Sequence, residues 1–572
     1  MSNKDIIRLF RKTADLLLLN DENEFKAKAY QNAVFKIEAL DEALSQKTDK
    51  EIREAGFSQR LTQKIRHLIQ EGTFDELEEQ LQKTPVGLVD MLEVQGLGAK
   101  KVRALWKELG VENLTELLRA CEEGHVAKIK GFGKKTQEKI ATGIRFRQAQ
   151  QGKFLYAQAA PYAEFLKEKL SEQESVTDCE LTGAMRRQLP IVEELRLVVH
   201  AADKADVYDF LNELDELSPD RAASSPFVWR GHFDENQLRV AVYFTAEKAA
   251  FTRQLLLDSG DERHFRYRIT QKDRPQTLFH LARNRDFEQE SDFYEHLGWQ
   301  YVPAPLREGG FELEQASEGK LPEKLLQPED IRGILHAHST YSDGKHSLRE
   351  MAEACRDAGY GYLGITDHSQ SAYYAGGLKP EDVRRQHEEI DQLNEELASF
   401  RIFKGIESDI LSDGRLDYTD EELARFDFVI ASVHSNLRMD VRKATQRLLE
   451  AIKNPFTTIL GHLTGRLLLR REGYPLDMEK ILEACREHEV AIEINAHPQR
   501  LDLDWRWVRA ALDEEISLSI NPDAHEIDGY AHIKYGVLTG QKGGLTPEAT
   551  LNTREADVLG TFFERRKTKQ TT

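Results

Sequence analysis

Six short apolar runs in the last part of the chain each end on a side chain that can bind a metal ion. The runs read ILHAH, YLGITDH, FKGIE, FVIASVH, TILGH and SLSINPDAH. Strands that alternate with helices build parallel α/β folds, which place their chemistry at the carboxyl ends of the strands. We therefore expect an α/β domain in which these polar side chains meet at one mouth of a barrel.

The side chains at these strand ends form a mixed set of imidazole and carboxylate ligands. The two histidines of HAH are two residues apart, so both imidazoles lie on the same face of a strand, and PDAH repeats this spacing. Such a nitrogen and oxygen set suits Mn, Fe or Zn better than Mg or Ca. The sequence predicts a centre for two or three divalent metal ions, with these candidate ligands: His336, His338, Asp343, His368, Glu407, His434, His462, Asp523 and His525.

These motifs resemble the PHP (polymerase and histidinol phosphatase) domain over residues 331–572. Its HxH with SDG, TDH, GxExD, SVH, GH and DAH motifs are all present. The resemblance implies a distorted (β/α)7 barrel with a trinuclear metal centre that hydrolyses phosphoesters, usually best with Mn. Metals in such a centre lower the pKa of a bound water, and the resulting hydroxide attacks phosphorus. The expected catalytic and phosphate-binding residues are Asp343, Glu407, His434, Arg466 and Arg500.

The first 150 residues are expected to be helical and contain two copies of a glycine pattern, GLGAK and GFGKK. A glycine pair between two helices allows a tight turn with positive φ. The turn exposes backbone N–H groups at a helix start, where a phosphate is favoured. A third, degenerate copy carries only Gly56. The pattern resembles the helix-hairpin-helix motif, which binds the DNA backbone without reading bases, and the candidate DNA-binding residues are Gly96, Gly98, Lys100, Gly131, Gly133 and Lys135.

The charge of the chain is distributed unevenly. The net charge is −20, but residues 1–150 carry 26 Lys and Arg against 24 Asp and Glu. A near-neutral helical region beside an acidic remainder is compatible with local DNA binding that is weak and sensitive to salt. An ordinary acidic protein is the alternative that charge alone leaves open.

Residues 182–199, TGAMRRQLPIVEELRLVV, together with LGWQYVPAPLRE at 297–308, resemble a bacterial family X DNA polymerase with a C-terminal PHP domain. The resemblance covers essentially the whole chain. The family's palm carries G-S, R-R-G, a D-x-D pair on one strand and a third Asp on the neighbouring strand. The corresponding residues here are Gly183, Arg187, Glu194, Arg196 and Gln237.

This substitution pattern predicts that the polymerase centre is vestigial. Nucleotidyl transfer needs carboxylates that hold two magnesium ions close together. The D-x-D positions hold Glu194 and Arg196, and a cation at the second position repels a metal ion. We expect polymerase activity to be lost, while Arg187 remains able to contact a phosphate.

The resemblance implies a multidomain α/β protein with a helical helix-hairpin-helix N-terminal region, a nucleotidyltransferase palm and thumb, and a C-terminal PHP barrel. The expected domains are a DNA-binding domain at 1–80, fingers at 81–150, a degenerate palm at 151–245, a thumb at 246–316, a linker at 317–330 and the PHP domain at 331–572.

No apolar stretch approaches the length of a membrane span, and the N-terminus lacks a signal-peptide pattern. The four cysteines are far apart, which favours reduced thiols over a disulfide framework. We therefore expect a cytoplasmic protein without a membrane partner.

The favoured interpretation is a DNA-repair protein that acts as a metal-dependent 3′–5′ exonuclease or 3′-end phosphoesterase on gapped or 3′-ended DNA, with other repair factors as further partners. Three alternatives stay open: an active gap-filling DNA polymerase with 3′–5′ exonuclease, a non-catalytic DNA-binding scaffold, and a small-molecule phosphatase of the histidinol-phosphate type. The sequence leaves the metal, the polarity of digestion, any lyase activity and the oligomeric state undetermined.

Overall fold

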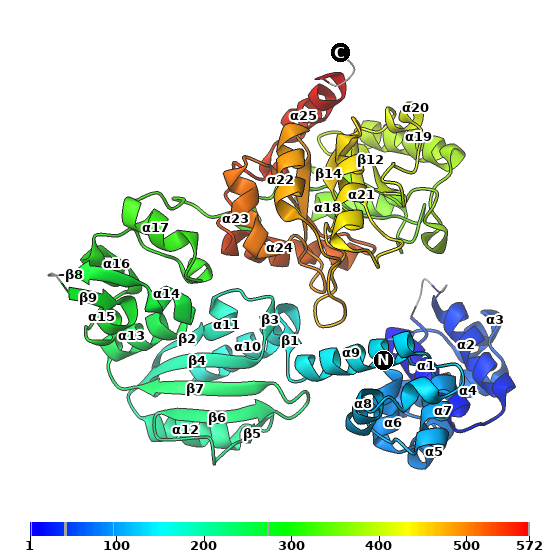
Figure 1. The fold of residues 1–572 in the computed structure, drawn as a ribbon, viewed down its shortest axis with the longest axis horizontal. Helices are drawn as coiled ribbons and strands as arrows, with labels where there is room; N and C mark the ends of the chain where they lie inside the picture. The colour runs from blue at the N-terminus through cyan, green and yellow to red at the C-terminus, as the bar shows by residue number, and fades with distance from the viewer. Residues whose placement is uncertain (2, 39, 41–42, 95, 272–273, 570–572) are drawn as a thin grey trace. The chain divides into compact units, whose positions relative to one another are not determined.

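The computed structural model describes residues 1–572 apart from 2, 39, 41–42, 95, 272–273 and 570–572 (Figure 1). The chain divides into two compact units, Met1–Gln151 and Gly152–Thr572. Within the described residues, every helix is too short or too polar to serve as a membrane span.

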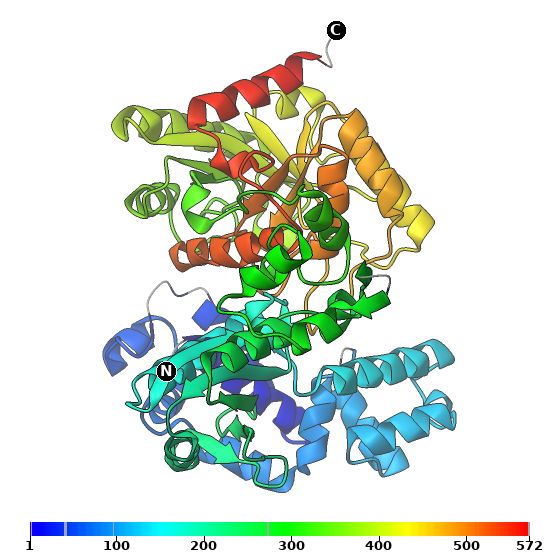
Figure 2. The same cartoon turned by 90° about the vertical axis from the view of Figure 1, so that its left-hand side faces the viewer.

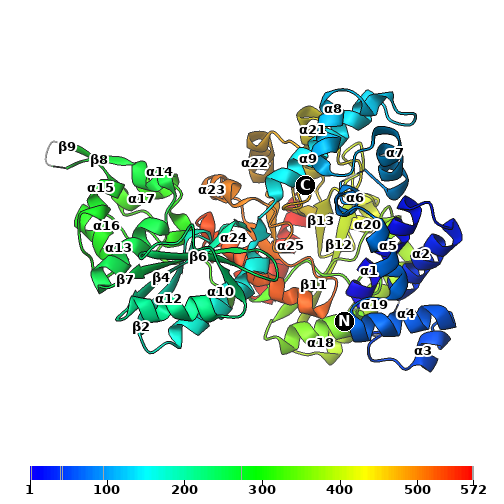
Figure 3. The ribbon, with the colours of Figure 1, turned by 90° about the horizontal axis from the view of Figure 1, so that it is seen from below.

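The first unit consists of helices (Figure 3). They pack around one apolar core. Its amphipathic helices turn an apolar stripe inward, as in α1, where Ile6, Phe10 and Leu17 are fully buried at helical spacing. The helices are α1 (Asn3–Leu19), α2 (Glu24–Glu38), α3 (Asp49–Glu54), α4 (Gln59–Glu71), α5 (Asp75–Lys83), α6 (Val86–Leu92), α7 (Ala99–Leu109), α8 (Leu114–Glu122), η1 (Val126–Lys128) and α9 (Lys134–Gln150).

A mixed five-stranded sheet of order β2-β4-β7-β6-β5 begins the second unit (Figure 1). Strands β4 and β7 run parallel, and the other neighbouring pairs are antiparallel. Alternate residues of β4 face opposite sides: Leu197 packs with α10 and α12, whereas Val198 packs with α13. The elements are α10 (Tyr156–Ser171), β2 (Val176–Thr182), α11 (Gly183–Arg186), β4 (Glu194–Ala201), α12 (Lys204–Glu213), β5 (Leu217–Pro219), β6 (Val228–Phe233) and β7 (Arg239–Thr245), with β1 (Phe154–Leu155) paired to β3 (Ile191–Val192).

A smaller, mainly helical region follows the sheet and has its own apolar core around Phe293 and Tyr294. Arg307 is fully buried there and donates to Glu290 at 2.7 Å, so its charge is neutralised inside the core. The elements are α13 (Lys248–Asp258), α14 (Glu262–Arg266), β8 (Arg268–Gln271), β9 (Arg274–Thr277), α15 (Leu278–Arg283), α16 (Glu290–Leu297), η2 (Ala304–Leu306) and α17 (Phe311–Glu318).

Seven parallel strands in sequential order form the C-terminal barrel, and helices surround them (Figure 2). A parallel bridge between Ala337 and Ala524 joins the segments that follow the first and last strands, so the barrel is nearly closed. Strands β11, β13, β14, β15 and β16 are buried along their whole length, as expected for a parallel sheet covered by helices. This confirms the predicted multidomain α/β fold with a distorted (β/α)7 barrel.

The strands of the barrel are β10 (Gly333–Ile334), β11 (Tyr362–Ile365), β12 (Arg401–Asp409), β13 (Phe428–Ser432), β14 (Thr457–Leu460), β15 (Ala491–Asn495) and β16 (Leu518–Asn521). The helices that accompany them are α18 (Leu348–Asp357), α19 (Pro380–Glu396), α20 (Asp420–Leu423), α21 (Val441–Lys453), α22 (Met478–Glu487), α23 (Trp505–Asp513), α24 (Ile533–Lys542) and α25 (Ala556–Lys569). Short 3-10 turns are η3 (Pro328–Asp330), η4 (Tyr373–Ala375), η5 (Ile527–His532) and η6 (Leu551–Thr553).

Candidate metal centre

The carboxyl ends of the barrel strands bring all nine candidate ligands together around Glu407. This carboxylate ends the apolar part of β12 and is 1% exposed. Its oxygens lie 3.0–3.7 Å from ring nitrogens of five histidines: His336, His338, His368, His434 and His462.

The remaining candidates complete the cluster on the side of β16. Asp523 accepts from His338 Nε2 at 3.2 Å, and His525 Nε2 lies 3.3 Å from Asp343 Oδ1. Three overlapping groups could each hold an ion, because their ligand atoms lie within 4.8 Å of one another. The groups are His338 with Asp343, His368 and His525; His336 with His338 and Glu407; and His368 with Glu407 and His434.

The donor atoms of the cluster fit a metal centre better than a hydrogen-bonded core. Several are buried and have no hydrogen-bond partner in the part of the chain that the structure describes: His336 Nε2, His338 Nδ1, His368 Nδ1, His462 Nδ1 and Glu407 Oε2. Buried polar atoms in proteins are normally paired, so a group of unpaired atoms in one place requires an explanation. Coordination of divalent ions by imidazole and carboxylate satisfies these atoms together.

Two of the ligands have strained backbone conformations. His462 has φ 25° and Asp523 has φ 53°, in the region that side chains larger than glycine rarely adopt. Such conformations persist where the surrounding structure fixes them, and they gather at functional sites. The strain supports a cluster whose geometry is set by the fold.

The buried carboxylates and imidazoles shift one another's pKa strongly in the metal-free protein. Burial alone raises the pKa of Glu407, but the cationic His434 and neighbouring histidines hold it well below its ordinary value. Burial opposes charge on His434, yet Glu407 and Asp409 raise its pKa to about 10. In the same way, Asp343 and Asp523 outweigh burial and raise the pKa of His525 to about 9.

Three further polar residues orient the ligands. Glu493 Oε1 bonds His336 Nδ1 at 2.6 Å, and its Oε2 accepts the backbone N–H of His462 at 2.7 Å. Asp409 bonds His434 Nδ1, and Asn495 donates to Asp523 at 3.1 Å. Sequence reasoning missed these residues, although a carboxylate inside the apolar run AIEIN and one two residues after Glu407 were available signals.

The two arginines expected to bind phosphate have different positions. Arg500 Nε lies 3.6 Å from Asp523 Oδ2, at the edge of the cluster. Arg466 donates to Asp504 and to the carbonyls of Arg500 and Leu501. These bonds occupy the Arg466 guanidinium, so the geometry favours a role in positioning the Arg500 loop over direct contact with a substrate.

The palm-like sheet holds an arginine, Arg196, at a position where the resemblance to family X polymerases predicts a metal-binding carboxylate. Arg196 Nε donates to Glu194 at 2.7 Å and its Nη1 donates to Asp258 at 2.9 Å. Gly183, with φ 58°, allows this packing, since a Cβ there would lie 3.0 Å from Arg196 Cδ. The side chain of Arg196 therefore forms an internal ion-pair network with both carboxylates.

One expected position is corrected by the structure. Gln237 has φ 62° and lies in the turn before β7, where its amide donates to Asp234 O, so it is outside the strand. The β7 residue in register with Arg196 is Ala241. The strand therefore begins later than the sequence comparison assumed, and the position beside Arg196 carries no carboxylate. Arg187 is also engaged, with Glu308 and Asp261.

The glycines of the N-terminal unit form the predicted turns. Gly96 and Gly131 have φ 89° and 91°, and Gly98 and Gly133 cap α7 and α9. Lys100 forms an ion pair with Glu24 at 2.7 Å, so it must exchange this partner to bind a phosphate. The exposed Lys135 on α9 has no ion pair within the described part of the chain and is available for a phosphate.

Comparisons with known proteins agree with this organisation. The PHP domain family matches residues 335–497, a helix-hairpin-helix domain family matches 1–74, and a SAM-like helix-hairpin-helix tandem family matches 88–145. A Bacillus subtilis protein named DNA polymerase/3′-5′ exonuclease PolX is 35% identical over 572 residues, covering 99% of this chain and 100% of that protein. A probable phosphatase of Caldanaerobacter subterraneus is 32% identical over 29% of this chain and 63% of its own length. A probable phosphatase of a Thermoanaerobacter species is 25% identical over 41% of this chain and 96% of its own length.

The position of Glu493 predicts a loss of metal affinity when its charge is removed. In Glu493→Gln the hydrogen bond to His336 weakens, and affinity should fall about 10- to 100-fold, as for other residues that orient metal ligands. Titration of the metal-free protein with Mn²⁺ measures this. Glu483→Gln, which changes a carboxylate of the same charge on α22, serves as the control and should bind like the wild type. Equal affinities in the two variants would contradict the role of Glu493.

The raised histidine pKa values predict that metal binding releases protons. His434 and His525, with pKa near 10 and 9, are protonated at neutral pH without metal, whereas a metal binds neutral imidazole. Affinity should therefore rise with pH up to this range. Both histidines have a higher pKa in the folded, metal-free protein than the value of 6.5 expected in the unfolded chain. Their protonation therefore stabilises the metal-free fold fully below pH 6.5, and this stabilisation is lost as the pH rises through about 9 to 10. Calorimetry in buffers of different ionisation enthalpy counts the protons; a binding heat independent of the buffer contradicts the prediction.

Proposed function

Because the chain belongs to the PolX-type family X DNA polymerases that carry a C-terminal PHP domain, we propose that it is a metal-dependent 3′–5′ exonuclease or 3′-end phosphoesterase of DNA repair. Its helix-hairpin-helix domains indicate DNA binding, and its PHP domain indicates hydrolytic nuclease or phosphatase activity. The observation that carries the proposal is the convergence of nine candidate ligands, Glu407 among them, in one cluster at the mouth of the barrel.

The cluster residues have distinct roles in the proposed hydrolysis. Bound metal ions would lower the pKa of a coordinated water and neutralise the leaving oxygen. Glu407 belongs to two of the three groups, one of which contains His434, and Asp343 belongs to the third; each of these residues would act as a ligand to an ion held by its group. Arg500 supplies positive charge at the cluster edge for the phosphate oxygens. The mixed donor set favours Mn²⁺, with Zn²⁺ and Fe²⁺ as alternatives that metal analysis of the purified protein distinguishes.

Two exposed tyrosines favour a nucleic acid over a small phosphate ester as substrate. Tyr373 is 87% exposed and Tyr374 is 70% exposed, on the turn that follows His368. The ring of Tyr374 lies 6.1 Å from the His368 ring and 6.5 Å from the His434 ring. An exposed aromatic ring beside a phosphoesterase centre offers a surface on which a nucleic-acid base can stack. The names of some relatives suggest a small-molecule phosphatase as the alternative. Hydrolysis of a small phosphate ester requires neither these exposed rings nor the DNA-binding hairpins.

We also propose that polymerase activity is lost. The Arg196 guanidinium lies between Glu194 and Asp258, so the two carboxylates already share a cation that cannot support nucleotidyl transfer. A gap-filling polymerase with 3′–5′ exonuclease activity is the alternative, and the name of the Bacillus subtilis relative describes a DNA polymerase and 3′–5′ exonuclease.

Asp523→Asn should reduce hydrolysis of DNA by more than about 100-fold, because it removes a negative ligand from the cluster. DNA binding should stay within about 2-fold of wild type, since the hairpins of the N-terminal unit are unchanged. Nuclease assays and fluorescence anisotropy measure the two properties. Asp513→Asn, on the exposed end of α23, is the matched control. Undiminished hydrolysis in Asp523→Asn would falsify the assignment of the active centre.

A labelled primer on a gapped template with Mn²⁺ separates nuclease from polymerase. The primer should shorten at the same rate with and without deoxynucleotides, because the palm cannot add nucleotides. His338→Ala should stop the shortening, while Asp258→Ala should leave it unchanged. Primer extension in the wild type would overturn the loss of polymerase activity but leave the nuclease proposal intact.

A further inference from the structure

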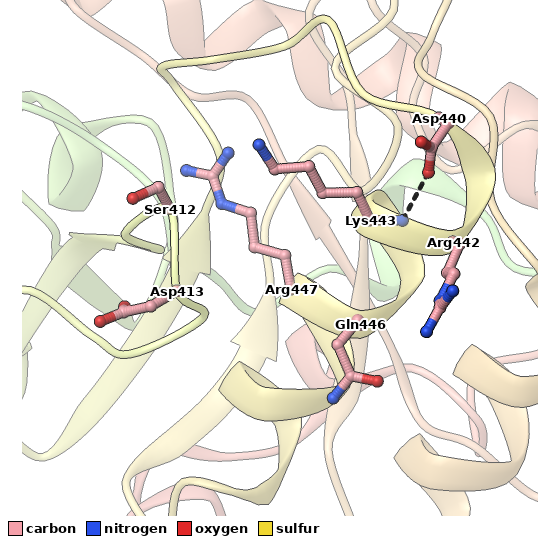
Figure 4. Close-up of a pocket in the computed structure, with 7 residues that line it drawn as sticks. All are labelled: Ser412, Asp413, Asp440, Arg442, Lys443, Gln446 and Arg447. Carbon is pink, nitrogen blue, oxygen red and sulfur yellow. Dashed lines mark hydrogen bonds between the residues drawn. The ribbon is translucent and has the colours of Figure 1, made fainter.

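A solvent-open pocket of about 370 Å³ lies between the loop after β12 and the start of α21 (Figure 4). Its wall is formed by the basic residues Arg442, Lys443 and Arg447, the acidic residues Asp413 and Asp440, and the polar residues Ser412 and Gln446. The metal-centre assignment makes no use of this pocket.

Arg447 places a buried positive charge at the inner wall. The residue is 3% exposed, and its guanidinium donates to Leu411 O at 2.8 Å, to Ser435 O at 3.0 Å and to Ile410 O. Within the described chain it forms no ion pair with a carboxylate. Carbonyl groups orient a guanidinium without neutralising its charge, and a buried charge without a counter-ion is costly. The pKa of Arg447 is accordingly lowered, chiefly by burial.

Lys443 adds a second cation on the same side of the pocket. Figure 4 shows its ammonium and the Arg447 guanidinium directed toward one another. The Lys443 side chain forms no ion pair with any residue that the structure describes. Two cations that face each other repel unless an anion lies near both, so this arrangement favours an anionic ligand.

The acidic residues of the wall do not supply that anion. Asp440 caps α21 and accepts the backbone N–H of Lys443 at 2.8 Å. Asp413 accepts from Arg415 Nε at 2.8 Å, and its carboxylate points away from the two cations (Figure 4). The ammonium of Lys443 therefore remains available to a ligand, while the guanidinium of Arg447, whose nitrogens donate to three carbonyl groups, adds positive charge behind it.

The inner wall of the pocket is joined directly to the metal centre. Arg447 holds the carbonyl of Ser435, which follows the candidate ligand His434. It also holds the carbonyl of Ile410, which follows Asp409, the hydrogen-bond partner of His434. The pocket and the candidate metal centre therefore share the chain segments that follow Asp409 and His434.

We propose that this pocket binds a backbone phosphate of the DNA strand under digestion, at a distance of one or more nucleotides from the phosphodiester at the metal centre. Lys443 is the phosphate contact that faces solvent, and Arg447 supplies buried charge and fixes the loops. This inference rests on the proposed nuclease function and adds a site that holds the strand and favours oligonucleotides over mononucleotide esters.

The test compares Lys443→Gln with Lys453→Gln in the full-length Mn²⁺ enzyme. Lys453 lies at the opposite end of α21, is exposed, and loses the same charge. Each protein is assayed on a labelled single-stranded oligonucleotide and on thymidine 5′-(p-nitrophenyl phosphate), which reaches only the metal centre. We expect the ratio of kcat/KM for oligonucleotide to that for the ester to fall roughly 10-fold in Lys443→Gln through a higher KM, with no change in Lys453→Gln.

Salt dependence provides a second readout that a merely structural effect would not produce. Removing one phosphate contact should reduce the slope of log(kcat/KM) against log salt by about 0.7 for the oligonucleotide. If Lys443→Gln has the same kcat/KM ratio and the same salt slope as Lys453→Gln, the proposed phosphate site is wrong. The nuclease proposal would still stand in that case. A wild-type enzyme that hydrolyses the ester but leaves the oligonucleotide intact would overturn the proposed function, and this site with it.

Discussion

The C-terminal barrel depends on the balance between buried imidazoles and buried carboxylates at its mouth. Glu407 is almost fully buried and lies within 3.7 Å of five histidines. Cationic His336 and His434 stabilise the buried carboxylate of Glu407, and the nearby carboxylates in turn raise the pKa of these two histidines. Burial instead lowers the pKa of His338 and His462, so the cluster combines charged and neutral imidazoles. The strand ends fix the positions of these groups. The hydrogen bonds of Glu493 and Asn495 and the left-handed backbone of His462 and Asp523 fix their orientation.

The same electrostatic rule has the opposite outcome in the palm-like sheet. There Glu194 pairs with Arg196 and Arg230, and Asp258 pairs with Arg196. These arginines compete with an external metal ion for the charge of the two carboxylates. In the barrel, several buried imidazole and carboxylate atoms have no hydrogen-bond partner among the described residues. The chain thus holds one pair of carboxylates bound to internal arginines and one cluster whose donor atoms fit a metal ion.

Residues near these palm-like carboxylates also have a structural role within the second unit. Arg187 pairs with Glu308, and Glu308 in turn accepts from Lys542 at the end of α24 of the barrel. Lys542 is 1% exposed, and burial lowers its pKa to about 8 despite the neighbouring Glu308. Gln188 also donates to Gln541 at 2.7 Å. The arginine expected to contact a phosphate thus helps to join the helical region, the palm-like sheet and the barrel.

The sequence by itself determined the barrel, its nine candidate ligands and the glycine turns, because strand-end histidines and Gly-x-Gly spacing are local patterns with a direct geometric meaning. Tertiary structure alone decided which groups pair across the chain. Asp258, which binds Arg196, is 62 residues away from it, and Glu493, which orients His336, is 157 residues away. It also decided that Gln237 lies in a turn and that the carbonyl groups of Ile410, Leu411 and Ser435 surround Arg447. These relations depend on which distant segments pack together, and no local pattern of residues encodes that packing.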